Sequence, residues 1–277
     1  MPQRARGWHS TIAGVAYDYL HYHFFHGFYA MYLASFVLVP MILLEIAAPA
    51  EKLHWPTVLF NLAYGPIFIA AAGMALAPIS SQLDPFLTLG LLAGDASQWS
   101  WWELALAALA YVAAFDFLYY WLHRAQHRFE FLWRYHRFHH ADANLSASSA
   151  FRHHWLEDTF RYAIIAIPLL LLFGTFTRFV PALALLMGAY GLFIHWNSKL
   201  TMGLMTGVLV GPRYHRIHHS VLPEHFDKNF AIFFPVFDRL FGTQVLPASG
   251  SVPATGIPGT QSPNHVRQLL PLPPLKT

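Results

Sequence analysis

Three clusters of histidine carry the clearest chemical signal in this chain. They are His123-x-x-x-His127, His136-x-x-His139-His140 and His215-x-x-His218-His219. Residues at positions i, i+3 and i+4 of a helix share one face, so we expect each cluster to aim its imidazoles at a single point. With 18 histidines in 277 residues, an H-x-x-H-H motif arises by chance roughly 0.08 times in such a chain. Two copies therefore indicate metal binding rather than scattered surface histidines.

The composition restricts which metal site these histidines can form. The chain contains no cysteine, so any metal must be held by histidine or oxygen ligands. Eight imidazoles exceed the four positions of a tetrahedral zinc ion and the six of an octahedral ion, which predicts two metals. His195 is a candidate for a ninth ligand, and His154 is a candidate for a tenth.

Residues that orient the ligands are also expected, because a metal-bound histidine usually donates its second ring N–H to a carboxylate or a carbonyl. Asp116 shares one helical stripe with His123 and His127, and an acid inside an apolar span is costly without such a role. We therefore expect Asp116 to support the first cluster. Further candidates for supporting catalytic residues are Asn197, Asn229, Glu157 and Asp227. Six histidines stay outside the predicted site, namely His9, His21, His23, His26, His54 and His265.

The elements that carry these clusters are predicted to lie in a membrane. The chain is 56% hydrophobic and only 11% charged, whereas an ordinary soluble domain is about 25% charged. Apolar runs at residues 29–48, 56–78 and 101–122 each approach the ~20 residues that cross a bilayer. The mixed segment 80–99 is typical of an interfacial or partly inserted element. Since no Pro or Gly occurs between Trp101 and Ile167, helix is plausible through the first two clusters.

A further apolar hairpin, residues 160–195, is broken by Gly174 and Pro181. Its two arms are short for full spans, so they form either thin transmembrane helices or a re-entrant pair. In both cases the chain returns to the side that it left. The hairpin therefore places the third histidine cluster on the same membrane face as the first two.

Charge indicates which face this is. Most of the Lys and Arg residues in polar stretches lie on either side of the hairpin. They run from Arg124 to Arg161 before it and from Lys199 to Arg239 after it. By the positive-inside tendency the histidine face is cytoplasmic, in a bacterial inner membrane or an ER-type membrane. The net charge of +3 indicates a membrane surface as partner and no nucleic acid, because the cations are scattered between apolar spans.

These patterns predict an all-α fold: a polytopic transmembrane helical bundle of about four spans, or with a re-entrant hairpin, and a cytoplasmic histidine-rich helical catalytic cap. We expect an N-terminal membrane region over residues 1–100 and a catalytic domain over residues 101–246. The Pro/Gly/Ser-rich residues 247–277 are expected to form a flexible tail.

Five motifs in this order resemble the fatty acid hydroxylase and sterol desaturase superfamily. They are D-F-L-Y-Y-W-L-H-R-A-Q-H from Asp116, L-W-R-Y-H-R-F-H-H from Leu132, F-R-H-H-W-L-E from Phe151, H-W-N from His195, and H-R-I-H-H-S-V-L-P-E-H-F-D-K-N-F from His215. The resemblance implies a di-iron site held by the eight clustered histidines, with His195 and His154 matching additional family histidines. Trp155, where Pro is frequent, and Phe230, where Tyr is common, depart from the family pattern.

The function that follows is an oxygenase which uses O₂ to hydroxylate or desaturate an unactivated C–H bond of a lipid. Its cofactor would be two iron ions, with zinc possible in purified material. The chain has no Rossmann glycine fingerprint and no haem-attachment or iron–sulfur cysteines, so a separate electron donor is expected, such as a ferredoxin or a cytochrome with its reductase. Alternatives are a zinc-dependent membrane hydrolase and a non-enzymatic metal transporter or haem cytochrome. Fatty acyl chains, sterols, carotenoids and aminolipids all stay open as substrates.

Overall fold

A computed structural model describes residues 12–83, 99–174, 180–259 and 269. Within these residues the fold is all helical, as predicted, and the one β contact is an isolated bridge between Ser220 and Thr255. The helices are α1 (Ile12–Ala47), α2 (Trp55–Leu83), α3 (Trp101–Arg128), α4 (Glu130–His140), η3 (Ala147–Phe151), α5 (Glu157–Arg161), η4 (Tyr162–Ala166), α6 (Ile167–Phe173), α7 (Val180–Ile194), η5 (Gly203–Gly207), α8 (Pro212–His218), η6 (Pro223–His225) and α9 (Val236–Leu240).

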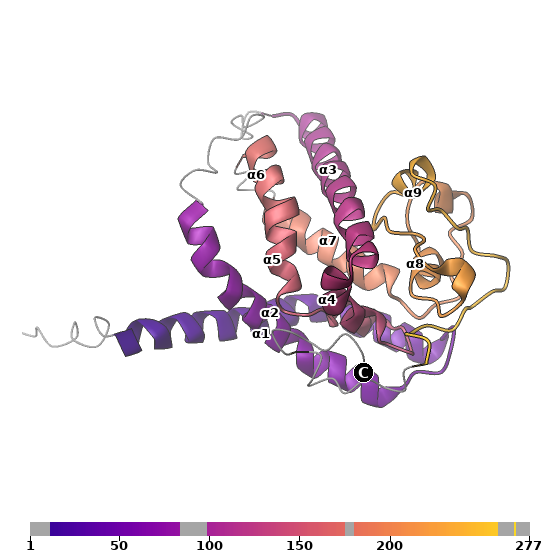
Figure 1. Ribbon diagram of the computed structural model, residues 1–277, viewed down its shortest axis with the longest axis horizontal. Coiled ribbons are helices and arrows are strands. Elements are labelled where there is room, and N and C mark those ends of the chain that lie inside the picture. Colours follow the sequence, from indigo (N-terminus) through magenta and orange to yellow (C-terminus); the bar gives the residue numbers. More distant parts are fainter. Residues whose placement is uncertain (1–11, 84–98, 175–179, 260–268, 270–277) are drawn as a thin grey trace, which may run out of the picture.

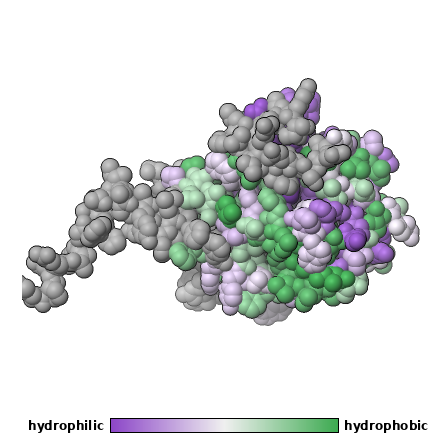
Figure 2. Space-filling model, turned by 90° about the horizontal axis from the view of Figure 1, so that it is seen from below, coloured by the Kyte–Doolittle hydropathy of each residue, from purple (hydrophilic) through white to green (hydrophobic). Residues whose placement is uncertain are grey.

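Three helices are long and apolar enough to cross a membrane. These segments are Tyr29–Ala47, Trp55–Ile79 and Trp101–Arg128, close to the three apolar runs that the sequence predicted. Their large apolar side chains are widely exposed, including Leu43, Leu59 and Leu106 at 60%, 60% and 58%. Such exposure is costly in water but suits a surface that faces lipid. Figure 2 shows wide apolar areas on one face of the molecule, with polar side chains gathered in a compact patch among them.

The histidine-bearing elements α4 and α8 lie beside α3 and the hairpin. Figure 1 shows α3 beside the continuous column of α5 and α6, with α4 at its lower end and α8 and α9 to one side. Tyr119 and Leu122 of α3 pack against Ile165, Leu169 and Phe173 of that column. This apolar contact fixes the end of α3 that bears His123 and His127.

The hairpin has the form expected from its breaks. Its first arm runs from α5 through the π-helical turn η4 into α6, and it ends at Gly174, whose φ of 62° favours glycine. Its second arm is α7, a shorter apolar helix that ends at Ile194. His195 follows directly and returns to the other histidines, as predicted. The mixed segment 80–99 falls mostly outside the described residues.

The first two clusters are both helical, as expected, but they lie on separate helices because the backbone turns extended at Phe129 between α3 and α4. This break lets α4 fold back so that His136 faces His123. Residues 248–256 are not a free tail: Arg213 donates to the carbonyls of Ala248 and Ser251, and Arg216 donates to that of Pro253. Backbone hydrogen bonds also join Val221 to Ala254 and Gly256 to His219.

Candidate metal centre

Nine imidazoles converge in two adjacent groups that mix the three sequence clusters. Histidine group one consists of His123, His127, His136, His140 and His218, and histidine group two consists of His139, His195, His215 and His219. Within each group the potential ligand atoms all lie within 4.8 Å of one another. The expectation that each cluster aims at a single point is therefore wrong for both H-x-x-H-H motifs.

The helix geometry explains this division. His136 and His140, at i and i+4, point into group one, whereas His139 points into group two. Neighbouring residues of a helix diverge by about 100° around its axis, so the adjacent His139 and His140 can serve different groups. In α8 the pattern is reversed, since His218 enters group one while His215 and His219 enter group two.

In group one the ring nitrogens form a connected set. The Nε2 atom of His136 lies 3.0 Å from that of His123 and 3.1 Å from that of His140, which in turn lies 3.1 Å from that of His127. The Nε2 atom of His218 is buried with no hydrogen-bond partner, and its ring lies 4.3 Å from that of His123. Group one therefore offers five neighbouring nitrogen donors.

Group two is connected in the same way. The Nε2 atom of His195 lies 3.1 Å from that of His139 and 3.1 Å from that of His215, and the Nε2 atoms of His215 and His219 are 3.2 Å apart. The rings of His140 and His219 stack at 4.4 Å. The two groups therefore adjoin across this pair.

The hydrogen bonds of the outward-facing Nδ1 atoms determine the tautomer of each histidine, and therefore whether its inward-facing Nε2 carries a proton. The Nδ1 atoms of His123 and His139 meet the carbonyls of Phe230 (2.8 Å) and Arg152 (3.2 Å), and that of His195 meets the carbonyl of Gly191 (2.7 Å). A carbonyl can only accept, so each of these Nδ1 atoms carries the proton and each neutral Nε2 presents a bare lone pair. The same holds for His136, whose Nδ1 donates to Glu157.

Bare lone pairs therefore face each other at two places. The Nε2 atoms of His123 and His136 are 3.0 Å apart, and those of His139 and His195 are 3.1 Å apart. No hydrogen bond can form between two bare nitrogens, and their lone pairs repel. A cation between them converts this repulsion into coordination, so the donor arrangement fits one metal ion in each group.

The number and type of the donors restrict which metal would fit. Five imidazoles in group one exceed the four positions of tetrahedral zinc. Imidazole donors without thiolate suit iron, among other metals.

The electrostatic surroundings keep these rings neutral. Burial lowers the pKa of His136 to about 4 and the pKa of His195 to about 3. Burial, followed by the proximity of other imidazoles, also holds the pKa well below its usual value at His139, His140, His215, His218 and His219. Only neutral imidazole binds metal, so the buried site is prepared for ligation at neutral pH.

Glu157 is the carboxylate that orients a ligand most directly. It is fully buried, and its Oε1 accepts from His136 Nδ1 (3.0 Å), Gln126 Nε2 (2.9 Å) and Arg161 (3.0 Å). Burial alone would raise the pKa of Glu157, but Arg161 and the nearby histidines hold it well below its usual range. Because these donors occupy Oε1, we assign the trio of His136, His153 and Glu157 to support of group one.

Asp116 acts differently from the expectation. It does not accept from a histidine; instead its two oxygens accept the backbone N–H groups of Ile232 (2.8 Å), Phe233 (3.1 Å) and Phe234 (2.6 Å). Asp238, which the sequence reasoning missed, accepts the N–H groups of Phe230 and Ala231. Together the two carboxylates fix residues 230–234 and thereby the Phe230 carbonyl that orients His123.

Asn197 and Asn229 also hold backbone rather than imidazole. Asn197 Nδ2 donates to the Glu51 carbonyl (2.7 Å), and Asn229 bonds to Tyr214 and Val245. Glu45, a fully buried acid on α1 that the sequence reasoning missed, accepts the N–H groups of Ala147 and Asn197 (2.8 Å each). Its position inside an apolar span was the available signal.

The remaining histidines occupy other places. His154 joins neither group; its Nδ1 accepts from the Leu156 N–H, and its ring packs on Tyr135. His153 instead stacks on His139 at 4.1 Å, because the turn after η3 directs it inward. His54 is exposed and bonds to Thr57, and the helix α1 carries His21, His23 and His26. His9 and His265 lie outside the described residues.

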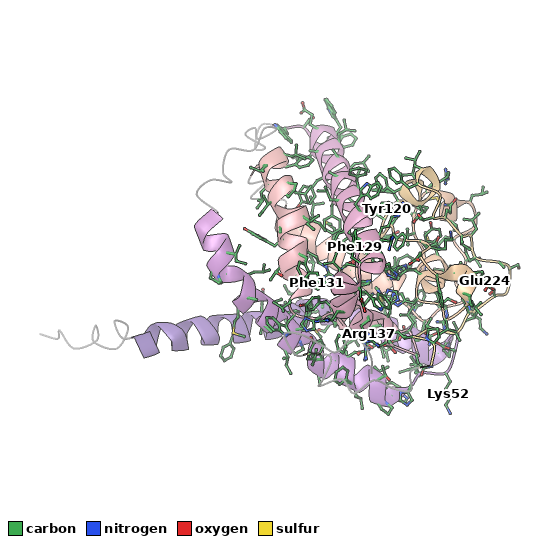
Figure 3. All side chains as sticks on the ribbon, viewed as in Figure 1. Lys52, Tyr120, Phe129, Phe131, Arg137 and Glu224 are labelled. Atoms are coloured by element: carbon green, nitrogen blue, oxygen red, sulfur yellow. The ribbon has the colours of Figure 1, made fainter. Side chains whose placement is uncertain are left out.

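An apolar cavity of about 330 Å³ reaches both histidine groups. Its walls include Tyr111, Phe115 and Tyr119 of α3 and the small residues Ala184, Gly188 and Gly191 of α7; its polar end includes His123, His139, His195 and His215. Ala184 and Gly188 also line a second apolar groove of about 330 Å³ between α1 and α7. These two small residues are thus shared by the cavity and the groove. In Figure 3, Tyr120 is labelled on the side of α3 that faces α8 and α9, and Phe129 is labelled near the point where α3 meets α4.

Comparisons with known proteins agree with this geometry. Residues 108–243 match the sequence profile of the fatty acid hydroxylase family. The chain is similar to an alkylglycerol monooxygenase from Danio rerio (33% identity over 53% of this chain and 31% of that protein). It is also similar to an ornithine lipid hydroxylase from Rhizobium tropici (29% over 61% and 50%) and a very-long-chain aldehyde decarbonylase from Arabidopsis thaliana (29% over 54% and 25%).

The matches cover only part of each relative, since this chain spans from a quarter to a half of their lengths. No solved structure shows significant similarity to the chain. These relatives are named for different substrates, so they do not identify one substrate for this chain. The matched family region, residues 108–243, contains all nine converging histidines.

Proposed function

We propose that this protein, whose residues 108–243 belong to the fatty acid hydroxylase family, is an integral-membrane di-iron oxygenase that hydroxylates an unactivated C–H bond of a lipid. The facing bare nitrogens of His123 and His136, and of His139 and His195, carry the proposal. The two groups offer only neutral imidazoles as donors, and such a donor set fits two ions without an anionic ligand. The bound irons would supply the activation of O₂ with electrons from outside.

The chain's own residues would bind and orient the substrate. The cavity presents aromatic and aliphatic walls along α3 and α7, and it meets His139, His195 and His215 at its end. An aliphatic chain can bury its length against these walls while one carbon lies beside the histidines. The same walls exclude water from the reacting carbon. The substrate is therefore a lipid with a long aliphatic portion, entering from the membrane beside α7.

The orientation of the site is part of the proposal. Arg124, Arg128, Arg134 and Arg137 lie at the polar ends of α3 and on α4, where the histidines converge. By the positive-inside tendency this end faces the cytoplasm, where electron-transfer proteins are available. The cavity would bring the lipid to His139, His195 and His215 of group two and to His123 of group one, while His127 of group one lies nearer to the polar surface.

Isotope labelling tests the proposed reaction. Membranes from cells that express the protein would be supplied with ¹⁸O₂, and the lipids compared with those of cells expressing His139→Ala. We expect a hydroxylated lipid that is present only with the unmodified protein and that carries one ¹⁸O atom. Label incorporated from H₂¹⁸O instead would indicate hydrolysis and contradict the proposal. An alkene product without label would assign desaturation in place of hydroxylation.

A further inference from the structure

His127 is the most exposed of the nine histidines in the two groups. Its side chain is 10% exposed, whereas the other eight histidines are buried. The Oδ1 atom of Asp227 lies 3.6 Å from His127 Nδ1, and the Asp227 side chain is itself 72% exposed. A molecule that touches Asp227 is therefore separated from group one by a single side chain.

The segment that contains Asp227 contacts three histidines of group one. The carbonyl of Lys228 accepts from His218 Nδ1 (2.8 Å), and the carbonyl of Phe230 accepts from His123 Nδ1 (2.8 Å). Asp227 and Asn229 both have positive φ, 57° and 58°, which is uncommon for residues other than glycine. This backbone is held by the bonds of Asn229 to Tyr214 and Val245. The segment therefore presents the Asp227 carboxylate to His127, the Lys228 carbonyl to His218 and the Phe230 carbonyl to His123.

A basic groove of about 550 Å³ lies along this segment. We define the basic groove by Arg124, Arg128, Phe129, Asp227 and Lys228, which line it together with Trp121. Three cationic side chains face one carboxylate, and that carboxylate is turned toward His127. Phe129 and Trp121 are exposed at 59% and 42%. Exposed aromatic residues beside cations are typical of surfaces that bind an acidic protein partner.

We propose that the basic groove is the docking surface for an acidic one-electron carrier protein. The inference rests on the proposed function, since the hydroxylation R–H + O₂ + 2 e⁻ + 2 H⁺ → R–OH + H₂O needs two electrons from outside. Each docked carrier would deliver one electron through the Asp227–Phe230 segment to group one and leave oxidised. Two docking events then complete one turnover.

The geometry favours a protein carrier over an anionic lipid headgroup at these cations. A headgroup would be satisfied by Arg124, Arg128 and Lys228 alone and would gain nothing from the exposed edge of His127. An electron carrier requires that short path, and it also requires a partner surface for Phe129. The cavity that suits a lipid chain lies elsewhere, between α3 and α7.

Direct binding is the first measurement. The full protein, loaded with iron in phosphatidylcholine nanodiscs, would be titrated with a strongly acidic plant-type [2Fe–2S] ferredoxin as the probe. The matched control is Lys52→Glu, an exposed cation at the α1–α2 turn, which Figure 3 places away from Phe129. We expect Arg124→Glu/Arg128→Glu to raise the Kd at least about tenfold and Lys52→Glu to leave it within about twofold. The neutral pair Arg124→Gln/Arg128→Gln should give an intermediate loss of affinity, and the wild-type affinity should fall with added salt.

Turnover with two reductants is the second measurement. The charge-reversed variant should lose ferredoxin-driven turnover but retain that driven by dithionite with methyl viologen, because a small reductant needs no docking surface. Unchanged ferredoxin binding in the variant, or equal losses in Lys52→Glu, would overturn the docking surface. A change confined to binding of phosphatidylglycerol vesicles would assign the groove to lipid headgroups and also overturn it. Normal docking with no turnover from either reductant would instead count against the oxygenase alone.

Discussion

His139 and His140 are consecutive residues of α4, yet their imidazoles enter different histidine groups, with ring planes at 87° and centroids 5.7 Å apart. The two neighbours therefore report on two metal ions separately. His139→Ala and His140→Ala should each lower the metal content from about two ions per chain to about one, and each should reduce product formation at least about a hundredfold. Metal analysis of the membrane-inserted proteins checks this. His54→Ala, at an exposed histidine outside both groups, is the control.

Asp116 fixes the segment that orients His123. Asp116→Asn replaces an oxygen by an amide nitrogen that cannot accept from the backbone N–H groups of residues 232–234. We expect the free energy of unfolding to fall by about 2 kcal/mol, since a buried donor left unpaired costs about 1–3 kcal/mol. The melting temperature in detergent would measure it. Glu103→Gln, at the half-buried cap that begins the same helix, should shift that temperature much less. Equal shifts would show that Asp116 holds no special contact.

Glu157 is predicted to set the affinity of group one for its metal. Glu157→Gln removes the charge that holds the Nδ1–H of His136, and loss of such a partner costs about 10- to 100-fold in metal affinity. Competition with a chelator followed by metal analysis gives the affinity. Asp158→Asn is the matched control, because Asp158 pairs with Arg161 without contacting a histidine of either group. An unchanged metal affinity in Glu157→Gln would contradict the role given to this carboxylate.

Gly188 should determine the length of aliphatic chain that the cavity accepts. A Cβ atom added at Gly188 meets no atom within 4 Å, so Gly188→Leu fills open space rather than clashing. We expect the product profile to shift toward shorter chains, with metal content unchanged. Ala189→Leu is the control, because Ala189 lines the groove between α1 and α7 but not the cavity. Lipid mass spectrometry measures the profile, and an identical shift in both variants would refute the assignment.

The spans and the helical class could be predicted because they depend on local composition. The apolar runs at residues 29–48, 56–78 and 101–122 nearly coincide with the three helices that can cross a membrane. The hairpin was also predictable, since Gly174 and Pro181 interrupt an otherwise apolar stretch. Its consequence, the return of His195 to the other histidines, follows from topology alone.

The division of the histidines between two groups could not be predicted from spacing. The i, i+3, i+4 rule places three residues on one broad face, but that face is wide enough to serve two ions when the imidazoles of α4 meet those of His218 and His219. In the same way, the turn after η3 determines that His153, and not His154, packs against the histidine groups. Likewise, composition alone made residues 248–256 appear free, because the arginines that hold them lie on α8.

X-ray absorption at the iron edge of the iron-loaded protein tests whether the histidines hold two separate ions. We expect nitrogen ligands from several imidazoles at about 2.1–2.2 Å, no sulfur, and two irons per chain, with the ligands of one ion changed in His139→Ala and those of the other in His140→Ala. A single tetrahedral site, or a spectrum that responds identically to both substitutions, would contradict it.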